Sequence, residues 1–130
     1  MPILVVSDVK NSTETQFSQW EQALISYTDS ASVINKLDTA IKGHHSYQIL
    51  VVDDQIKEDP LALIHTLDLD ARFSTLMKVL SLHPKDDRNK QWFDHAREIG
   101  CFDFIQKPLL PSELDKKMMR SWQRWQALSI

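Results

Sequence analysis

The segment YQILVVDDQIKEDP, from Tyr47 to Pro60, carries the clearest indication of the fold of this chain. Its four consecutive apolar residues, ILVV, run directly into two carboxylates, Asp53 and Asp54. The same tetrapeptide occurs at Ile3–Val6, where a serine and an aspartate follow it. Runs that are apolar throughout, without alternation of polar and apolar residues, are typical of strands covered on both faces, as in parallel sheets. Two such strands therefore indicate a buried parallel sheet.

Short apolar runs alternate with amphipathic stretches along the chain. The runs expected as strands are Ile3–Val6, Leu24–Thr28, Gln48–Val52, Met77–Leu82 and Phe102–Gln106. Helical spacing of apolar residues predicts helices over about 11–27, 33–41, 60–67 and 86–99, and from 111 onward. Asp59 and Pro60 are expected as the N-cap and first residue of the third helix. Five strands that alternate with five helices predict a doubly wound α/β fold, with helices on both faces of one open parallel sheet.

Length and composition predict one soluble globular domain over residues 1–130. The net charge of −3 gives no reason to expect nucleic acid as a partner. No apolar run approaches the roughly 20 residues of a membrane span, and the N-terminus lacks a signal-peptide pattern. The single cysteine, Cys101, is typical of a reducing, cytoplasmic setting. Two glycines cannot build a P-loop or a dinucleotide-binding fingerprint.

Polar side chains follow the apolar runs at the points where the predicted strands end. Ligands of open α/β sheets bind beyond the carboxyl ends of the strands, so these residues are the candidate site. They are Ser7, Asp8, Asp53, Asp54, Ser81 and Lys107. Clustered carboxylates suit Mg²⁺, and a carboxylate beside a metal ion can attack a phosphoryl donor. The hydroxyl and the ammonium group would then hold the phosphoryl oxygens.

Four segments, ILVVSD, QILVVDD, KVLSL and GCFDFIQKP, resemble in this order the receiver domain of two-component response regulators. The resemblance extends from Ile3 to about Leu128. It implies a flavodoxin-like fold whose five parallel strands have the order 2-1-3-4-5. It also implies a phosphorelay module, not an enzyme beyond slow autodephosphorylation, that takes a phosphoryl group from a histidine kinase or phosphotransfer protein.

The resemblance assigns roles to individual positions of this sequence. Asp53 would be the phosphoryl acceptor, and Asp8, Asp53 and the Gln55 backbone carbonyl would be the Mg²⁺ ligands. Ser81 and Lys107, which Pro108 follows, would contact the phosphoryl group. Phe104 would be the aromatic switch. The fourth helix, the fifth strand and the fifth helix are expected to bind an output partner or a second copy of the chain.

Two departures from the family pattern keep a second interpretation open. Ser7 stands where the family has an acid, and Leu82 stands where it has a small residue. These changes are compatible with a pseudo-receiver that binds proteins without being phosphorylated. An enzyme that uses Asp53 as a nucleophile is disfavoured, because the short loops leave no segment to cap a substrate.

The apolar run alone does not choose between the two adjacent aspartates. A strand buried on both faces carries no alternation, and a slip of one residue would exchange the directions of the two side chains. The family pattern selects Asp53, together with Asp8. Asp54 is then expected to point away, toward a loop.

Overall fold

The computed structural model describes residues 2–7, 21–26, 29–84, 87–106 and 110–128, with side-chain surroundings left out for residues 21–26 and 111. The strands are β1 (Pro2–Ser7), β2 (Glu21–Ser26), β3 (Ile49–Asp53), β4 (Met77–Leu82) and β5 (Asp103–Gln106). The helices are α1 (Ser30–Lys42), α2 (Pro60–Asp68), α3 (Lys90–Glu98) and α4 (Pro111–Leu128), with a short 3₁₀ helix, η2 (Ala71–Phe73).

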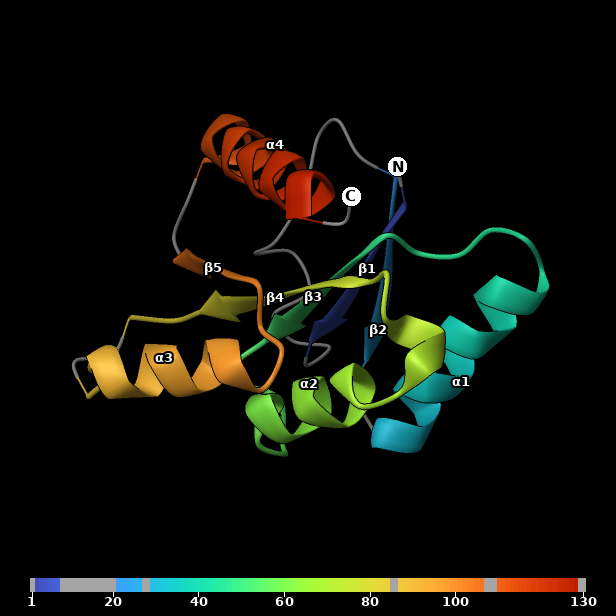
Figure 1. Cartoon of the computed structure of the whole chain (residues 1–130), viewed down its shortest axis with the longest axis horizontal. Coiled ribbons are helices and arrows are strands. Elements are labelled where there is room, and N and C mark those ends of the chain that lie inside the picture. The colour runs from blue at the N-terminus through green and yellow to red at the C-terminus, as the bar shows by residue number, and fades with distance from the viewer. Residues whose placement is uncertain (1, 8–20, 27–28, 85–86, 107–109, 129–130) are drawn as a thin grey trace.

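The strands form one sheet in the order β2-β1-β3-β4-β5, and every neighbouring pair is parallel. The chain therefore reverses its direction of winding at β1 and β3. Helices α1, α2 and α3 lie on one side of the sheet and α4 lies on the other (Figure 1). This is the predicted doubly wound α/β class, and its carboxyl strand ends meet at one edge.

Each face of the sheet has its own apolar core. Leu50 and Val52 of β3 pack on the side of α1, α2 and α3. Ile49 and Val51 pack on the opposite side, against Leu114, Met118 and Trp122 of α4. These four apolar residues of β3 are all fully buried. The two cores explain the missing alternation in the sequence, because both sets of side chains of the strand leave water.

The helix signals of the sequence are borne out for α1, α2 and α4. Asp59 caps α2, accepting a hydrogen bond from the Leu61 amide at 3.0 Å, and Pro60 is the first residue of the helix. Gly43 follows the end of α1, and Pro111 begins α4. No helix in the described part of the chain is long and apolar enough to cross a membrane.

Two predicted boundaries are wrong. The helical pattern expected over about 11–27 runs into β2, which contains Leu24 and pairs with β1 from Glu21 to Ser26; residues 8–20 lie outside the described part. Pairing with β1 satisfies the strand's backbone groups, which overrides a spacing of apolar residues that also suits a helix. The fourth predicted helix begins at Lys90 instead of Asp86, because the Asn89 side chain accepts the Trp92 amide at 3.0 Å and caps it there.

Candidate functional site

The parallel register brings Asp53 and Ser81 together at the carboxyl edge of the sheet. The two residues are direct partners in the β3–β4 pairing. Val6 pairs with Val52 one position earlier, so Ser7 ends β1 next to Asp53. All three side chains are buried, with 1–3% of each residue exposed. The switch between β1 and β3 thus places one carboxylate between two hydroxyl groups.

The two apolar cores decide which aspartate shares a face with Ser81. In β3, Ile49 and Val51 belong to the core under α4, and Asp53 follows at the same period of two. In β4, Val79 belongs to that core and Ser81 follows it in the same way. Asp53 and Ser81 therefore share the α4 side of the sheet, whereas the next residue, Asp54, turns to the other side.

Hydrogen bonds hold Asp53 and the segment that follows it. The Asp53 Oδ1 atom accepts the Gln55 amide at 2.8 Å, and the Asp54 amide donates to the Ser81 carbonyl at 3.0 Å. Gln55 is exposed, in the loop where the sequence predicts a carbonyl ligand for a metal ion. The Ser81 Oγ atom is buried and has no hydrogen-bond partner among the described residues. A buried hydroxyl in this state is costly, and it is suited to bind a ligand oxygen.

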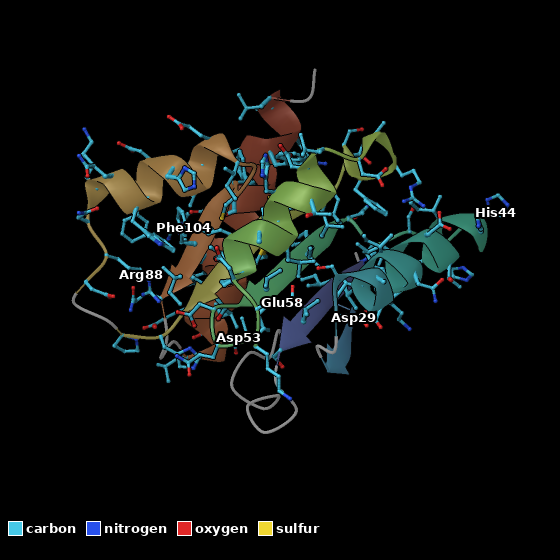
Figure 2. The ribbon with its side chains drawn as sticks, turned by 90° about the horizontal axis from the view of Figure 1, so that it is seen from below. Asp29, His44, Asp53, Glu58, Arg88 and Phe104 are labelled. Atoms are coloured by element: carbon cyan, nitrogen blue, oxygen red, sulfur yellow. The ribbon has the colours of Figure 1, made fainter. Side chains whose placement is uncertain are left out.

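Asp54 turns toward the loop between β4 and α3, where two cationic or polar side chains hold it. Its Oδ1 atom lies 2.6 Å from His83 Nδ1, and its Oδ2 atom accepts the His83 amide at 3.2 Å. The Arg88 guanidinium also pairs with Oδ2, and it donates to the His83 carbonyl at 2.8 Å. Figure 2 shows Asp53 at the end of its strand and Arg88 in the segment before α3.

His83 and Arg88 are not among the site residues predicted from the sequence. They lie 29 and 34 positions from Asp54 in the chain, so no local pattern links them. Two adjacent carboxylates after a buried strand are a usable signal, because such a pair needs a nearby cation. His83 Nδ1 is also 3.6 Å from Asp53 Oδ1, so this imidazole lies between the two aspartates.

Phe104 lies on the opposite face of the sheet from Ser81. It pairs with Leu80 in the β4–β5 register, and its ring packs 4.9 Å from the ring of Phe93 and 6.1 Å from that of Trp92. Arg88 stacks over Trp92, with its guanidinium carbon 5.3 Å from the ring centroid. These contacts link Asp54 to Phe104 through α3.

Three of the predicted positions, Asp8, Lys107 and Pro108, lie outside the described residues. Their roles stay predictions.

The predicted partner face consists of α3, β5 and α4. Within it, polar contacts of Asp103 connect β5 to α4. This β5 carboxylate is buried, and its Oδ2 atom accepts from the Ser121 hydroxyl and from Arg124 at 2.7 Å. The Trp125 ring packs edge-on against Phe102, at 5.1 Å. Met119, outside the apolar stripe of α4, is 41% exposed. Polar contacts of Asp103 therefore join β5 to α4, and one apolar side chain of α4 is exposed.

Comparisons with known proteins identify the fold. No family model and no curated protein matches the sequence. Among solved structures, a protein described as a two-component system response regulator/GGDEF domain protein is similar with a TM-score of 0.73 and 18% identity, over 97% of this chain and 50% of that one. This chain thus spans half the length of that protein.

Two further structures cover nearly all of both chains. A CheY-like response regulator receiver domain protein from Methanospirillum hungatei is similar with a TM-score of 0.65 and 13% identity, over 97% of this chain and 96% of that one. A protein of Burkholderia pseudomallei, named as pilus assembly-related, is similar with a TM-score of 0.67 and 21% identity. The match covers 93% of this chain and 88% of that one. The chain has the fold of response regulator receiver domains.

Proposed function

We propose that this chain is a phosphoryl-accepting receiver domain of a two-component system. A carboxylate oxygen of Asp53 attacks the phosphorus of a phosphohistidine on a histidine kinase or phosphotransfer protein. A P–O bond forms as the P–N bond breaks, and the imidazole nitrogen keeps the electron pair and takes up a proton. The product is an aspartyl phosphate, a covalent intermediate that carboxylates form in other phosphoryl-transfer proteins.

The observation that carries this proposal is the pairing of Asp53 with Ser81. Both residues end neighbouring strands on the same face, and the Ser81 hydroxyl is buried without a partner among the described residues. A phosphoryl group on Asp53 adds three strong acceptor oxygens at this place. The hydroxyl can donate to one of them, which removes the cost of its burial.

The donor set fits Mg²⁺, because Asp53 and its neighbours offer hard oxygen ligands. Asp53, Asp8 and the Gln55 carbonyl would hold the ion. When bound, Mg²⁺ neutralises charge on the carboxylate and on the phosphoryl oxygens. Ser7, which ends β1 beside Asp53, contributes a neutral oxygen where an acid would contribute a charge. We therefore expect weaker Mg²⁺ binding than in a site with three carboxylates.

Phosphorylation of Asp53 would change the side-chain packing of α3. Arg88 binds Asp54 and stacks on Trp92, which packs against Phe93 and Phe104. A dianionic group on Asp53 would attract the Arg88 guanidinium and so change the packing of Trp92. The face of α3, β5 and α4 would then bind an output partner or a second copy with altered affinity.

A pseudo-receiver is the second candidate, and two observations favour it. Ser7 removes a charge from the metal pocket, and the Arg88 and His83 side chains already engage the acid next to Asp53. In this alternative the chain binds its partner through the same face without a phosphoryl group.

Incubation with acetyl phosphate and Mg²⁺ distinguishes the two candidates. Intact mass spectrometry should find one added phosphoryl group on the parent chain and none on Asp53→Asn. The matched control is Glu58→Gln, an exposed carboxylate in the same loop, which should still form the adduct. Ser81→Ala should form it with a reduced change in tryptophan fluorescence. An unmodified parent chain at saturating reagent, with beryllofluoride also without effect, would contradict the phosphoryl-acceptor function and support the pseudo-receiver.

A further inference from the structure

His83 places a nitrogen ligand between the two aspartates. Its Nδ1 atom lies 2.6 Å from Asp54 Oδ1 and 3.6 Å from Asp53 Oδ1. One ligand atom from each of the three residues can be chosen so that all three atoms lie within 4.8 Å of one another. Ligand atoms about 2.1 Å from a tetrahedral metal ion are about 3.4 Å apart. The distance from His83 Nδ1 to Asp53 Oδ1 already matches this geometry. The distance from His83 Nδ1 to Asp54 Oδ1 would need to increase by less than about 1 Å.

The kinds of ligand atom select the kind of metal. Mg²⁺ is bound almost entirely by oxygen, whereas an imidazole combined with carboxylates suits Zn²⁺ and Co²⁺. Coordination through Nδ1 requires the tautomer that carries its proton on Nε2. This set shares Asp53 with the predicted Mg²⁺ site, but it adds His83 and Asp54 and does not use Asp8.

Arg88 divides the two oxygens of Asp54 between different partners. The guanidinium binds Oδ2 and the His83 carbonyl, which leaves Oδ1 facing His83 Nδ1. The side chain of Arg88 is only 9% exposed, and it is stacked on Trp92. Partners of this kind orient metal ligands and hold them in place. Two carboxylates and one guanidinium carry a summed charge of −1, which favours a divalent cation.

A second observation, besides the three ligand residues, is the buried Ser81 hydroxyl beside Asp53, the same hydroxyl that the proposed phosphoryl group would engage. Its residue is 1% exposed, its hydroxyl has no partner among the described residues, and it lies on the same face as its register partner Asp53. A fourth ligand, or a water molecule on the metal ion, would satisfy it. The protein residues otherwise supply three ligands, the number that leaves one open position on a tetrahedral ion.

From this geometry we propose that Asp53, Asp54 and His83 form a binding site for a borderline divalent transition-metal ion of the Zn²⁺ or Co²⁺ class. An ion held there takes up the Asp53 carboxylate that the predicted Mg²⁺ site also needs. In the part that rests on the proposed function, it therefore competes with the Mg²⁺ that supports phosphorylation of Asp53. The site makes the receiver sensitive to a metal ion other than the Mg²⁺ that supports phosphoryl transfer.

Co²⁺ titration of the whole chain tests the site, because the visible absorption of the ion reports nitrogen and oxygen ligands directly. We expect one bound equivalent that Zn²⁺ displaces and that Mg²⁺ at equal concentration does not. His83→Ala should weaken Co²⁺ binding by at least about tenfold, since even the loss of a supporting partner costs about 10–100-fold. Asp54→Asn, which keeps the shape of the side chain, should weaken it as well. Circular dichroism verifies that each variant is folded.

Exposed histidines provide the matched controls. His95→Ala on α3 and the double variant His44→Ala/His45→Ala should bind Co²⁺ like the parent chain. Unchanged affinity in His83→Ala, or loss of binding in a control variant, would overturn the proposal. Phosphorylation in Mg²⁺ alone is measured separately. An adduct without Co²⁺ binding refutes only the transition-metal site, and Co²⁺ binding through His83 without an adduct refutes only the phosphoryl-acceptor function.

Discussion

Replacement of Arg88 by methionine should destabilise the fold strongly, because it leaves the Asp54 carboxylate without its principal cation. The side chains of this pair are 9% and 4% exposed. Breaking a buried ion pair from one side costs about 3–5 kcal/mol. The amide of His83 still donates to Asp54, so the lower end of this range applies. This figure of about 3 kcal/mol includes about 1 kcal/mol for the lost bond to the His83 carbonyl, and methionine keeps part of the packing on Trp92.

We therefore expect a decrease of about 3 kcal/mol in the free energy of unfolding, a large part of the usual 5–15 kcal/mol. With a urea dependence of about 1.5 kcal/mol per molar, the midpoint should fall by about 2 M. Tryptophan fluorescence and circular dichroism measure the transition. The control is Lys42→Met, which removes an exposed lysine paired with Asp38 at 2.9 Å and should leave the midpoint nearly unchanged.

A double-mutant cycle with Asp54→Asn isolates the pair itself. The double variant should be more stable than the sum of the single changes predicts, by about 2 kcal/mol, because it removes both charges together. If Arg88→Met lowers the free energy of unfolding by less than about 1 kcal/mol, or if the two changes are additive, the pair does not behave as a buried ion pair. The proposed orientation of Asp54 by Arg88 would then be wrong.

Three further predictions concern other parts of the fold. Gly100→Ala should lower the free energy of unfolding by about 1–3 kcal/mol, because φ is 118° and a Cβ atom would overlap the Asp68 side chain. Gly43→Ala, at φ −84°, should lower it less in the same urea assay. Lys78→Met should lower the free energy of unfolding by about 2 kcal/mol, because the buried ammonium donates to the Phe73 and Leu76 carbonyls at 2.9 and 3.1 Å. A variant as stable as the parent chain would contradict this. Burial raises the pKa of the Cys101 thiol from 9.0 to about 12, so the folded state retains a proton that the unfolded state loses between these values. The free energy of unfolding should therefore fall as the pH rises from about 9 to 12, and it should fall less in Cys101→Ser. Iodoacetamide at pH 8 should modify the thiol only as fast as the chain unfolds.

Much of the architecture was predictable because its signals are local. Apolar runs without alternation indicated strands buried on both faces, and the structure gives each face of β3 its own core. Asp59 with Pro60, and Gly43, marked helix ends through backbone conformation and capping, which depend on a few neighbouring residues. The region around Leu24 was harder, because its apolar residues suit both a helix and a strand. Pairing with β1 decided in favour of the strand.

By itself the sequence determined the class of the fold and the type of residue at each strand end, because burial, capping and strand length act over short distances in the chain. The strand pattern left Asp53 and Asp54 equivalent, since a strand covered on both faces carries no alternation to distinguish them, and the resemblance to receiver domains selected Asp53. The tertiary structure adds which of the two shares a face with Ser81. The register of β3 with β4 sets Asp53 beside Ser81, and the loop before α3 brings His83 and Arg88 to Asp54 from 29 and 34 positions away. These contacts depend on how distant segments pack together, which no local pattern of residues records.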